Sequence, residues 1–223
     1  IDADPQANAT SGVGISPPEI GKSTYDVIIN GTNPSEAILA TSTPNLDIIP
    51  SHIDLVGAEV ELVNRFKREF ILRDAIEGLS EYYDYIFIDC APSLGLITIN
   101  ALTAANSVII PIQCEMYSLE GLGKLKNTIN IVQEALNPDL EIEGILMTMY
   151  DSRLRLSNIM AQEIKSNSSD TVFETIIHRN SKIGEAPNMH IPVALYDATC
   201  KGSRNYLELA MEFIKMNGDS IHQ

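Results

Sequence analysis

Three aspartates lie where apolar residues give way to polar ones. Asp89 follows the apolar run at 85–88, while Asp2 and Asp4 stand in a polar segment just after Ile1. An apolar run with aromatic and β-branched residues is typical of a strand buried on both faces. Because open α/β sheets bind ligands at the carboxyl ends of their strands, these carboxylates could hold a metal ion or orient an attacking water. The alternative for each is a turn-capping aspartate without chemistry.

The residues after Asp89 predict a turn and then a helix. Pro92 and Ser93 end the strand, and Ser93 is the expected N-cap of a helix over residues 94–105. An apolar strand that ends in an aspartate has the pattern of a Walker B element, in which the aspartate helps to hold Mg²⁺ against phosphates. Since the same pattern is common in α/β proteins without that function, the capping role stays open for Asp89.

A glycine–lysine pair imitates a phosphate-binding loop. Residues 21–24 are Gly-Lys-Ser-Thr, which matches the end of the pattern G-x-x-x-x-G-K-[ST]. Ser16, however, stands at the first glycine of that pattern, and the prolines at 17 and 18 lack the N–H groups that would bind phosphate. Glu19 would repel phosphate, and no strand precedes the loop. We therefore predict that these residues do not bind phosphate.

The rest of the sequence alternates between predicted strands and predicted helices. Apolar runs predict strands at 46–50, 107–112, 141–150 and 172–177. Helical spacing and capping signals predict helices at 23–29, 35–39, 54–64, 67–79, 157–166 and 203–216, a long helix ending near 136, and an irregular segment at 179–192. This alternation predicts an α/β fold with a mostly parallel central sheet and helices on both faces, in a single domain over residues 1–223.

Composition limits the possible surroundings and partners of the chain. The sequence has 223 residues and a formal net charge of −15, which disfavours indiscriminate binding to nucleic acid. Any contact with DNA would therefore need a local basic patch. The cysteines have no C-x-x-C spacing, and no apolar run reaches the roughly 18 residues that span a bilayer. These features predict a cytosolic protein with reduced cysteines.

Five separated blocks, in order along the chain, resemble the motifs of ParA-type (Soj-like) partition ATPases. The blocks are residues 2–10, 89–95, 111–121, 148–153 and 179–187. The likeness covers essentially the whole sequence, and MinD and the nitrogenase iron protein resemble it more distantly. The resemblance implies a P-loop NTPase-like fold, with ATP and Mg²⁺ as cofactors.

The phosphate loop of that family, K-G-G-V-G-K-T, has no counterpart in the sequence. In the family it lies on the strand and helix ahead of the position that corresponds to Ile1. We therefore expect an N-terminally truncated domain, with unpaired strand edges in its sheet. Because the backbone and lysines of the loop supply most of the phosphate recognition, we also expect that the chain does not hydrolyse ATP by itself.

The matching motifs imply roles for individual residues. Asp4 corresponds to the carboxylate that orients the attacking water, and Asp2 would support that loop or the metal shell. Asp89 would bind Mg²⁺, through water. The residues implied to lie near the adenine are Met149, Arg179 and Asn180. Their alternative roles are core packing for the methionine and ordinary solvated side chains for the other two.

The resemblance also implies partners. The family binds DNA non-specifically as an ATP-bound homodimer, and a ParB-like partner stimulates its hydrolysis. The expected DNA contacts are Arg179, Lys182, Lys201 and Arg204. Together with Glu185 and Asp197 they leave residues 178–204 with a charge of +2, since four basic side chains stand against two acidic ones. An ordinary solvated surface is the alternative.

Two other functions stay open from the sequence. The chain could be a non-hydrolysing remnant that binds DNA or a partner, or it could be a MinD-like ATPase. The segment 217–223 is short and polar and lacks the pattern of a basic amphipathic helix that would bind a membrane surface. We therefore expect no membrane partner, and a cytoplasmic protein associated with the nucleoid.

Overall fold

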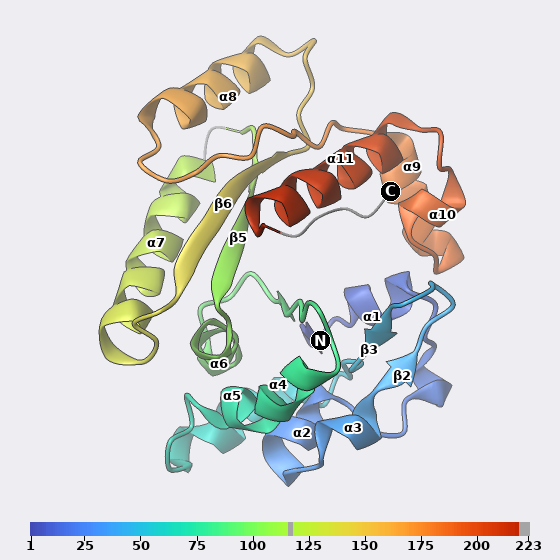
Figure 1. The fold of residues 1–223 in the computed structure, drawn as a ribbon, viewed down its shortest axis with the longest axis vertical. Helices are drawn as coiled ribbons and strands as arrows, with labels where there is room; N and C mark the ends of the chain where they lie inside the picture. Colours follow the sequence, from blue (N-terminus) through green and yellow to red (C-terminus); the bar gives the residue numbers. More distant parts are fainter. Residues whose placement is uncertain (116–117, 219–223) are drawn as a thin grey trace. The chain divides into compact units, whose positions relative to one another are not determined.

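The computed structural model describes residues 1–115 and 118–218, which form two compact units (Figure 1). Unit 1 consists of residues 1–106 and 128–140, and unit 2 of residues 107–127 together with the described chain from 141 onward. Residues 116 and 117 of the block at 111–121, and the C-terminal segment from 219, lie outside the described residues. The expectation of one domain stays a prediction.

Unit 1 holds two short strand pairs. Strand β1 (Asp2–Ala3) runs parallel to β4 (Asp89–Cys90), and β2 (Leu39–Ala40) runs antiparallel to β3 (Asp47–Ile48). Its helices are α1 (Asn8–Gly12), α2 (Thr24–Asn30), α3 (Pro34–Ala37), α4 (Leu55–Glu61), α5 (Ile71–Ile76) and α6 (Leu96–Ala104). Turns of 3-10 helix lie at Pro17–Glu19, Leu62–Asn64 and Glu77–Glu81. Helix α7 (Ser118–Ala135) begins in unit 2 and ends in unit 1.

Local capping decides where α2 begins and ends. Ser23 is its N-cap, and the backbone N–H and the hydroxyl of Ser23 both donate to Asp26 Oδ2, at 2.9 and 3.1 Å. The helix ends at Gly31, whose φ of 66° lies in the left-handed region that favours glycine. The end of the segment that imitates a phosphate loop therefore serves as the start of a capped helix. That this segment does not bind phosphate stays a prediction.

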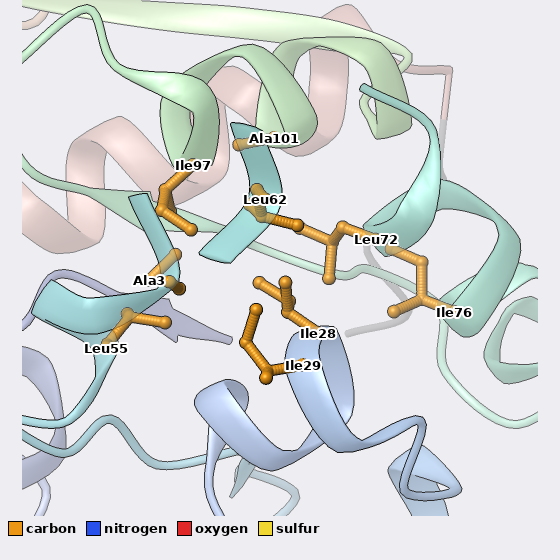
Figure 2. Packing of buried hydrophobic residues seen from close by; sticks show 10 residues of the cluster. Ala3, Ile28, Ile29, Leu55, Leu62, Leu72, Ile76, Ile97 and Ala101 are labelled. Carbon is orange, nitrogen blue, oxygen red and sulfur yellow. The ribbon is translucent and has the colours of Figure 1, made fainter. Parts of the chain in front are cut away.

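Helices α2, α4, α5 and α6 bring their apolar sides together to form the core of unit 1 (Figure 2). Its buried members include Ala3, Ile28, Ile29, Leu55, Leu62, Leu72, Ile76, Ile97 and Ala101. This arrangement confirms that the segments predicted as helices at 54–64 and 67–79 each bury one side. The second helix is shorter than predicted, because Lys67 adopts a left-handed φ of 52° and α5 begins only at Ile71.

Truncating Leu55 should strongly destabilise the fold. Its side chain is 0% exposed, so Leu55→Ala leaves a cavity and should lower the free energy of unfolding by about 2–5 kcal/mol. The neighbouring Val56 is 55% exposed, and Val56→Ala should change the free energy of unfolding by less than about 0.5 kcal/mol. Urea denaturation of both variants checks this, and equal effects would contradict the assigned core.

Unit 2 is built on a longer parallel pair, β5 (Ser107–Gln113) and β6 (Glu141–Thr148). Its helices, besides the start of α7, are α8 (Arg155–Asn167), α9 (Ser181–Glu185), α10 (Val193–Tyr196) and α11 (Lys201–Met216), with a 3-10 turn at Ala186–Met189. Phe173 is a fully buried member of its core and packs with α11 residues Leu209 and Phe213. A Cβ at Gly144 would lie 2.8 Å from the Phe173 ring, so the close approach of strand and ring requires glycine there.

The prediction of a strand at 85–88 is wrong. Strand β4 contains only Asp89 and Cys90, and the side chain of Phe87 is 61% exposed instead of buried on both faces. A ladder extends only as far as its partner, and β1 offers Asp2 and Ala3 alone. The apolar run shows that the residues suit a strand, but pairing depends on a neighbour that the run does not specify.

The predicted start of α6 is also wrong. The helix begins at Leu96 and not at residue 94, and Ser93 does not cap it. Glu59 of α4 takes that role, because its carboxylate accepts hydrogen bonds from the N–H groups of Leu96 (2.8 Å) and Ile97 (3.1 Å). A negative carboxylate at these free N–H groups stabilises the helix start.

Smaller corrections concern short elements. The strand predicted at 172–177 is reduced to an isolated bridge between Val172 and Ile145, because its backbone hydrogen bonds to β6 are too widely spaced to form a continuous ladder. Residues 179–192 are not irregular but contain α9, since Asn180 Oδ1 accepts the N–H of Lys182 (2.9 Å) and caps the helix. The helix expected over 35–39 ends at Ala37 and is followed by β2. Helix α1 forms in the polar segment after Asp4, where no helix was predicted. None of the helices in the described part of the chain is long and apolar enough to cross a bilayer.

Candidate functional site

Asp2 and Asp89 are neighbours across the parallel pair β1 and β4, where the register places one beside the other. The backbone N–H of Asp89 donates to the carbonyl of Ile1 at 2.9 Å, which fixes the two chain segments together. Asp2 is fully buried, whereas Asp89 is exposed. The fold of unit 1 therefore brings these two carboxylates together, and only one of them faces solvent.

The carboxylate of Asp2 is fully engaged by the chain that follows it. Its Oδ1 accepts the backbone N–H of Asp4 at 3.1 Å. Its Oδ2 accepts both the backbone N–H of Thr10 at 2.8 Å and the Thr10 hydroxyl at 2.7 Å. Asp2 thus lies inside strand β1, and its oxygens point at the loop that carries Asp4.

Asp4 lies in a tight turn directly after β1. Its Oδ1 accepts the N–H of Gln6 at 2.9 Å, and its carbonyl accepts the N–H of Ala7 at 2.9 Å. Ala7 has a φ of 54°, a left-handed conformation that costs a residue with a Cβ and persists only when the surroundings impose it. The half-buried Asp4 is therefore held on a constrained turn at the carboxyl end of a strand.

Electrostatics distinguish Asp89 from an ordinary surface aspartate. Although its side chain keeps an exposed surface, desolvation by the surrounding chain, and then the negative charges of Asp2 and Asp4, raise the pKa of Asp89 above its ordinary value. Burial also raises the pKa of the adjacent Cys90 thiol to about 12, so the thiol stays protonated at neutral pH. The site thus presents crowded carboxylate oxygens, without a competing thiolate.

Carboxylate oxygens are the ligands that Mg²⁺ prefers, so the donor chemistry fits that ion. Within residues 1–115 and 118–218, however, no group of three or more His, Cys, Asp or Glu side chains is placed to hold a metal. Both bonds from Thr10 go to Oδ2 of Asp2, which leaves that oxygen less available to a metal ion. A magnesium ion bound by Asp89 would therefore need water or phosphate oxygens to complete its shell.

The residues assigned to the adenine come together at the end of β6 in unit 2. Met149 follows the strand with a left-handed φ of 53° and is 38% exposed, so it is not a buried core residue. Tyr150 pairs with His178 by a parallel bridge and an edge-to-face ring contact at 5.2 Å. The N–H of Arg179 then donates to the carbonyl of Tyr150 at 2.9 Å, which sets Asn180 at the start of α9.

The basic residues expected to contact DNA come from the starts of α9 and α11. These helix starts touch, since a Cβ at Gly202 would lie 2.6 Å from the side chain of Ile183. Arg179, Lys201 and Arg204 are exposed. Lys182 instead forms an ion pair with Glu185 at 2.7 Å and lies 5.5 Å from the centre of the Tyr196 ring, so part of its charge is already neutralised.

Two residues that shape the site were not predicted from the sequence. Thr10 binds the Asp2 carboxylate, and Glu59 caps the helix that follows the Asp89 segment. Thr10 lies within a block that resembles a family motif, which is a weak signal. Neither partnership can be read from spacing, because each joins residues through the tertiary fold.

Comparisons with known proteins define the class. A family model described as "AAA domain" matches residues 1–142. The structure of cobyrinic acid a,c-diamide synthase from Mycobacterium smegmatis, with bound ATP analog and magnesium, is 35% identical with a TM-score of 0.83, over 94% of this chain and 78% of that one. MinD from Pyrococcus furiosus is 22% identical with a TM-score of 0.75, over 96% of this chain and 84% of that one, and shows the fold alone. The protein therefore has the P-loop NTPase-like α/β fold with parallel strands, as predicted.

Curated relatives then identify the family. The sporulation initiation inhibitor protein Soj of Bacillus subtilis is 49% identical over 98% of this chain and 86% of Soj. The chromosome partitioning protein ParA is 48% identical in Myxococcus xanthus, over 96% of this chain and 76% of that protein. In Caulobacter vibrioides it is 44% identical, over 98% of this chain and 83% of that protein. The chain belongs to the ParA/Soj family of chromosome-partitioning ATPases, which confirms the resemblance.

Proposed function

We propose that this protein serves DNA partition and carries the metal-binding and water-orienting residues of an ATP- and Mg²⁺-dependent ATPase. In this proposal Asp89 binds the metal ion and Asp4 orients the attacking water. The observation that carries the proposal is the parallel pairing of β1 and β4, which sets Asp89 beside Asp2 and places Asp4 directly after β1, where the buried Asp2 holds the Asp4 turn. This is the edge at which open α/β sheets bind ligands.

The proposed roles separate binding from chemistry. Mg²⁺, when bound, would neutralise phosphate charge as it develops during transfer. Asp89 suits metal binding because it is exposed, and because the nearby negative charges of Asp2 and Asp4 favour binding of a cation or a proton there. Asp4 suits water orientation because its turn is fixed at the backbone while its side chain remains half-exposed. Met149, Arg179 and Asn180 would contact the adenine, and Asp2 would support the loop.

The chain contains the metal and water side of such a site without a phosphate cradle. The one segment that imitates the cradle holds two prolines and a glutamate, and its serine caps α2. We therefore propose that the 223-residue polypeptide does not hydrolyse ATP by itself.

Further parts of the proposal concern partners. An ATP-bound homodimer would bind DNA without sequence preference through Arg179, Lys201 and Arg204, with a smaller part for the paired Lys182. A ParB-like partner would stimulate hydrolysis, and the protein would be cytoplasmic and associated with the nucleoid. These features rest on the family resemblance and on the exposure of the basic side chains.

A non-hydrolysing role is the second candidate, and the helix-capping role of Ser23 favours it. Under that alternative the chain would bind DNA or a partner protein without turning over nucleotide. The MinD-like alternative is supported by fold alone. The first candidate predicts that Mg²⁺ binds at Asp89, and the non-hydrolysing candidate does not.

Replacing Asp89 by asparagine should stabilise the metal-free protein and remove its response to Mg²⁺. Since folding raises the pKa of Asp89, the protonated form favours the folded state, and that stability is lost as the pH rises through the raised pKa. Asp89→Asn should therefore raise the free energy of unfolding at neutral pH. We expect a gain below about 1 kcal/mol, because solvent screens an exposed carboxylate. The difference should vanish at acid pH, below the ordinary pKa of aspartate.

Thermal unfolding at increasing Mg²⁺ concentration provides the measurement. At ten times the dissociation constant, Mg²⁺ should stabilise the parent by about 1.4 kcal/mol and should not stabilise Asp89→Asn. Asp84→Asn is the matched control, because Asp84 is exposed and lies outside the proposed site. An undiminished response to Mg²⁺ in Asp89→Asn would show that the metal binds elsewhere or not at all.

A further inference from the structure

A buried polar cluster contacts the turn that carries Asp4. It joins the ends of β1 and β3 to the starts of α1 and α2, and all of its members are 2% exposed or less. They are Asp2, Thr10, Thr24 and Ser51. Buried polar groups lose their bonds to water on folding, so each hydrogen bond inside such a cluster has a large effect on its geometry.

Thr10 is the centre of this cluster. Its hydroxyl accepts the backbone N–H of Ser51 at 2.9 Å, so its own proton is directed to Asp2 Oδ2 at 2.7 Å. Its backbone N–H donates to the same oxygen at 2.8 Å. Thr10 therefore supplies both bonds to Oδ2, and the remaining oxygen of Asp2 is left for the N–H of Asp4.

Thr24 takes part in the same cluster in a different way. Its hydroxyl donates to the backbone carbonyls of Asp2 (2.7 Å) and Pro50 (3.2 Å), and not to the Asp2 carboxylate. The two threonines thus perform separable tasks. Thr24 ties the backbone of β1 to that of Pro50, whereas Thr10 fixes the rotamer of the side chain that holds Asp4.

We infer that Thr10 is a positioning residue for Asp4, acting through the Asp2 carboxylate and anchored on the backbone of Ser51. The inference rests on the proposed function for the part played by Asp4, and on geometry alone for the effect of Thr10 on the loop. Without the Thr10 hydroxyl, Asp2 Oδ2 loses one of its two donors and the buried N–H of Ser51 loses its acceptor. The Asp2 side chain is then free to reorient, and the turn at residues 4–7 loses its support.

The test is amide hydrogen exchange of the 223-residue chain, measured residue by residue for the parent and for Thr10→Val. Valine keeps the shape of threonine and lacks the hydroxyl. The N–H groups of Asp4 and Gln6 should exchange at least tenfold faster in Thr10→Val, which corresponds to about 1.4 kcal/mol of local opening. The N–H groups of Ile97 and Leu72, in the core, provide the reference for global unfolding.

Three further variants make the result specific. Thr24→Val removes a buried hydroxyl from the same cluster and should leave the ratio of Asp4 exchange to core exchange unchanged. Thr10→Ser keeps the hydroxyl and should restore the protection seen in the parent. Asp2→Asn provides a second route if Thr10→Val does not fold, because an amide N–H₂ accepts no bond from Thr10 and the same two N–H groups should exchange faster.

Equal effects of Thr10→Val and Thr24→Val on the Asp4 and Gln6 amides would overturn the inference, as would failure of Thr10→Ser to restore protection. These outcomes differ from a failure of the proposed function. Loss of the Mg²⁺ response at Asp89 concerns the function, whereas exchange at Asp4 and Gln6 concerns the loop alone.

Discussion

Replacing Asp4 by alanine should lower ATP turnover by about 10²–10⁴-fold while leaving ATP affinity unchanged, in a form of the protein that carries a phosphate loop. The magnitude is that of a positioned group acting on a reacting water. Affinity should be preserved because Asp4 is held on its turn by backbone contacts and is not assigned to phosphate binding. An interaction made only in the transition state lowers kcat without changing ground-state binding.

The experiment joins the phosphate-loop segment of a family member to Ile1 and compares the chimera with its Asp4→Ala variant. Steady-state turnover gives kcat, and nucleotide titration gives the dissociation constant. Asp84→Ala serves as the matched control, since it removes an exposed aspartate outside the turn. The 223-residue chain without the added segment should show no turnover.

Either of two results would contradict this scheme. Turnover by Asp4→Ala at the rate of the parent chimera would remove the assignment of Asp4. Mg²⁺-dependent hydrolysis by the unmodified chain, abolished by Asp89→Ala, would show that residues within the chain bind phosphate after all.

The second large effect concerns DNA. Replacing Lys201 and Arg204 together by alanine should weaken ATP-dependent DNA binding about equally on any sequence. Both side chains are exposed at the start of α11, and neither is engaged in an ion pair that the structure describes. A dimer would lose two contacts from each subunit. Because each neutralised phosphate contributes about 0.9 to the slope of log affinity against log salt, the slope should become shallower by about 3.6.

A salt titration on two unrelated duplexes, with and without ATP, measures this slope. The matched control is Lys22→Ala combined with Lys67→Ala, which removes the same charge from exposed positions in unit 1. Lys182→Ala should have a smaller effect than Lys201→Ala or Arg204→Ala made singly, because the ammonium group of Lys182 is paired with Glu185. With a net charge of −15, the monomer without ATP should bind DNA weakly.

An unchanged slope in the double variant would exclude this patch. Binding that does not depend on ATP would exclude a nucleotide-dependent dimer as the switch. A loss that depends on DNA sequence would indicate base contacts, which scattered phosphate-binding lysines and arginines do not make.

Local pattern was sufficient for the longer elements. Residues 107–112 and 141–150 were predicted as strands, and β5 and β6 cover nearly the same ranges because apolar β-branched runs suit a paired ladder. The amphipathic spacing at 203–216 likewise predicts α11 to within two residues at its start. The family resemblance and the position of Asp4 after a strand also follow from the sequence, since ordered motifs and strand ends are local features.

Pairing and burial needed the tertiary structure. The run at 85–88 has the composition of a strand, yet β4 is as short as its partner, because a strand exists only where another backbone bonds to it. The sequence does not show that Asp2 is buried, and only the fold brings Thr10 and Ser51 around it. Glu59 replaces Ser93 as the cap of α6 for the same reason. The sequence by itself thus determined which carboxylates are candidates for chemistry, and long-range contacts decided which of them face solvent.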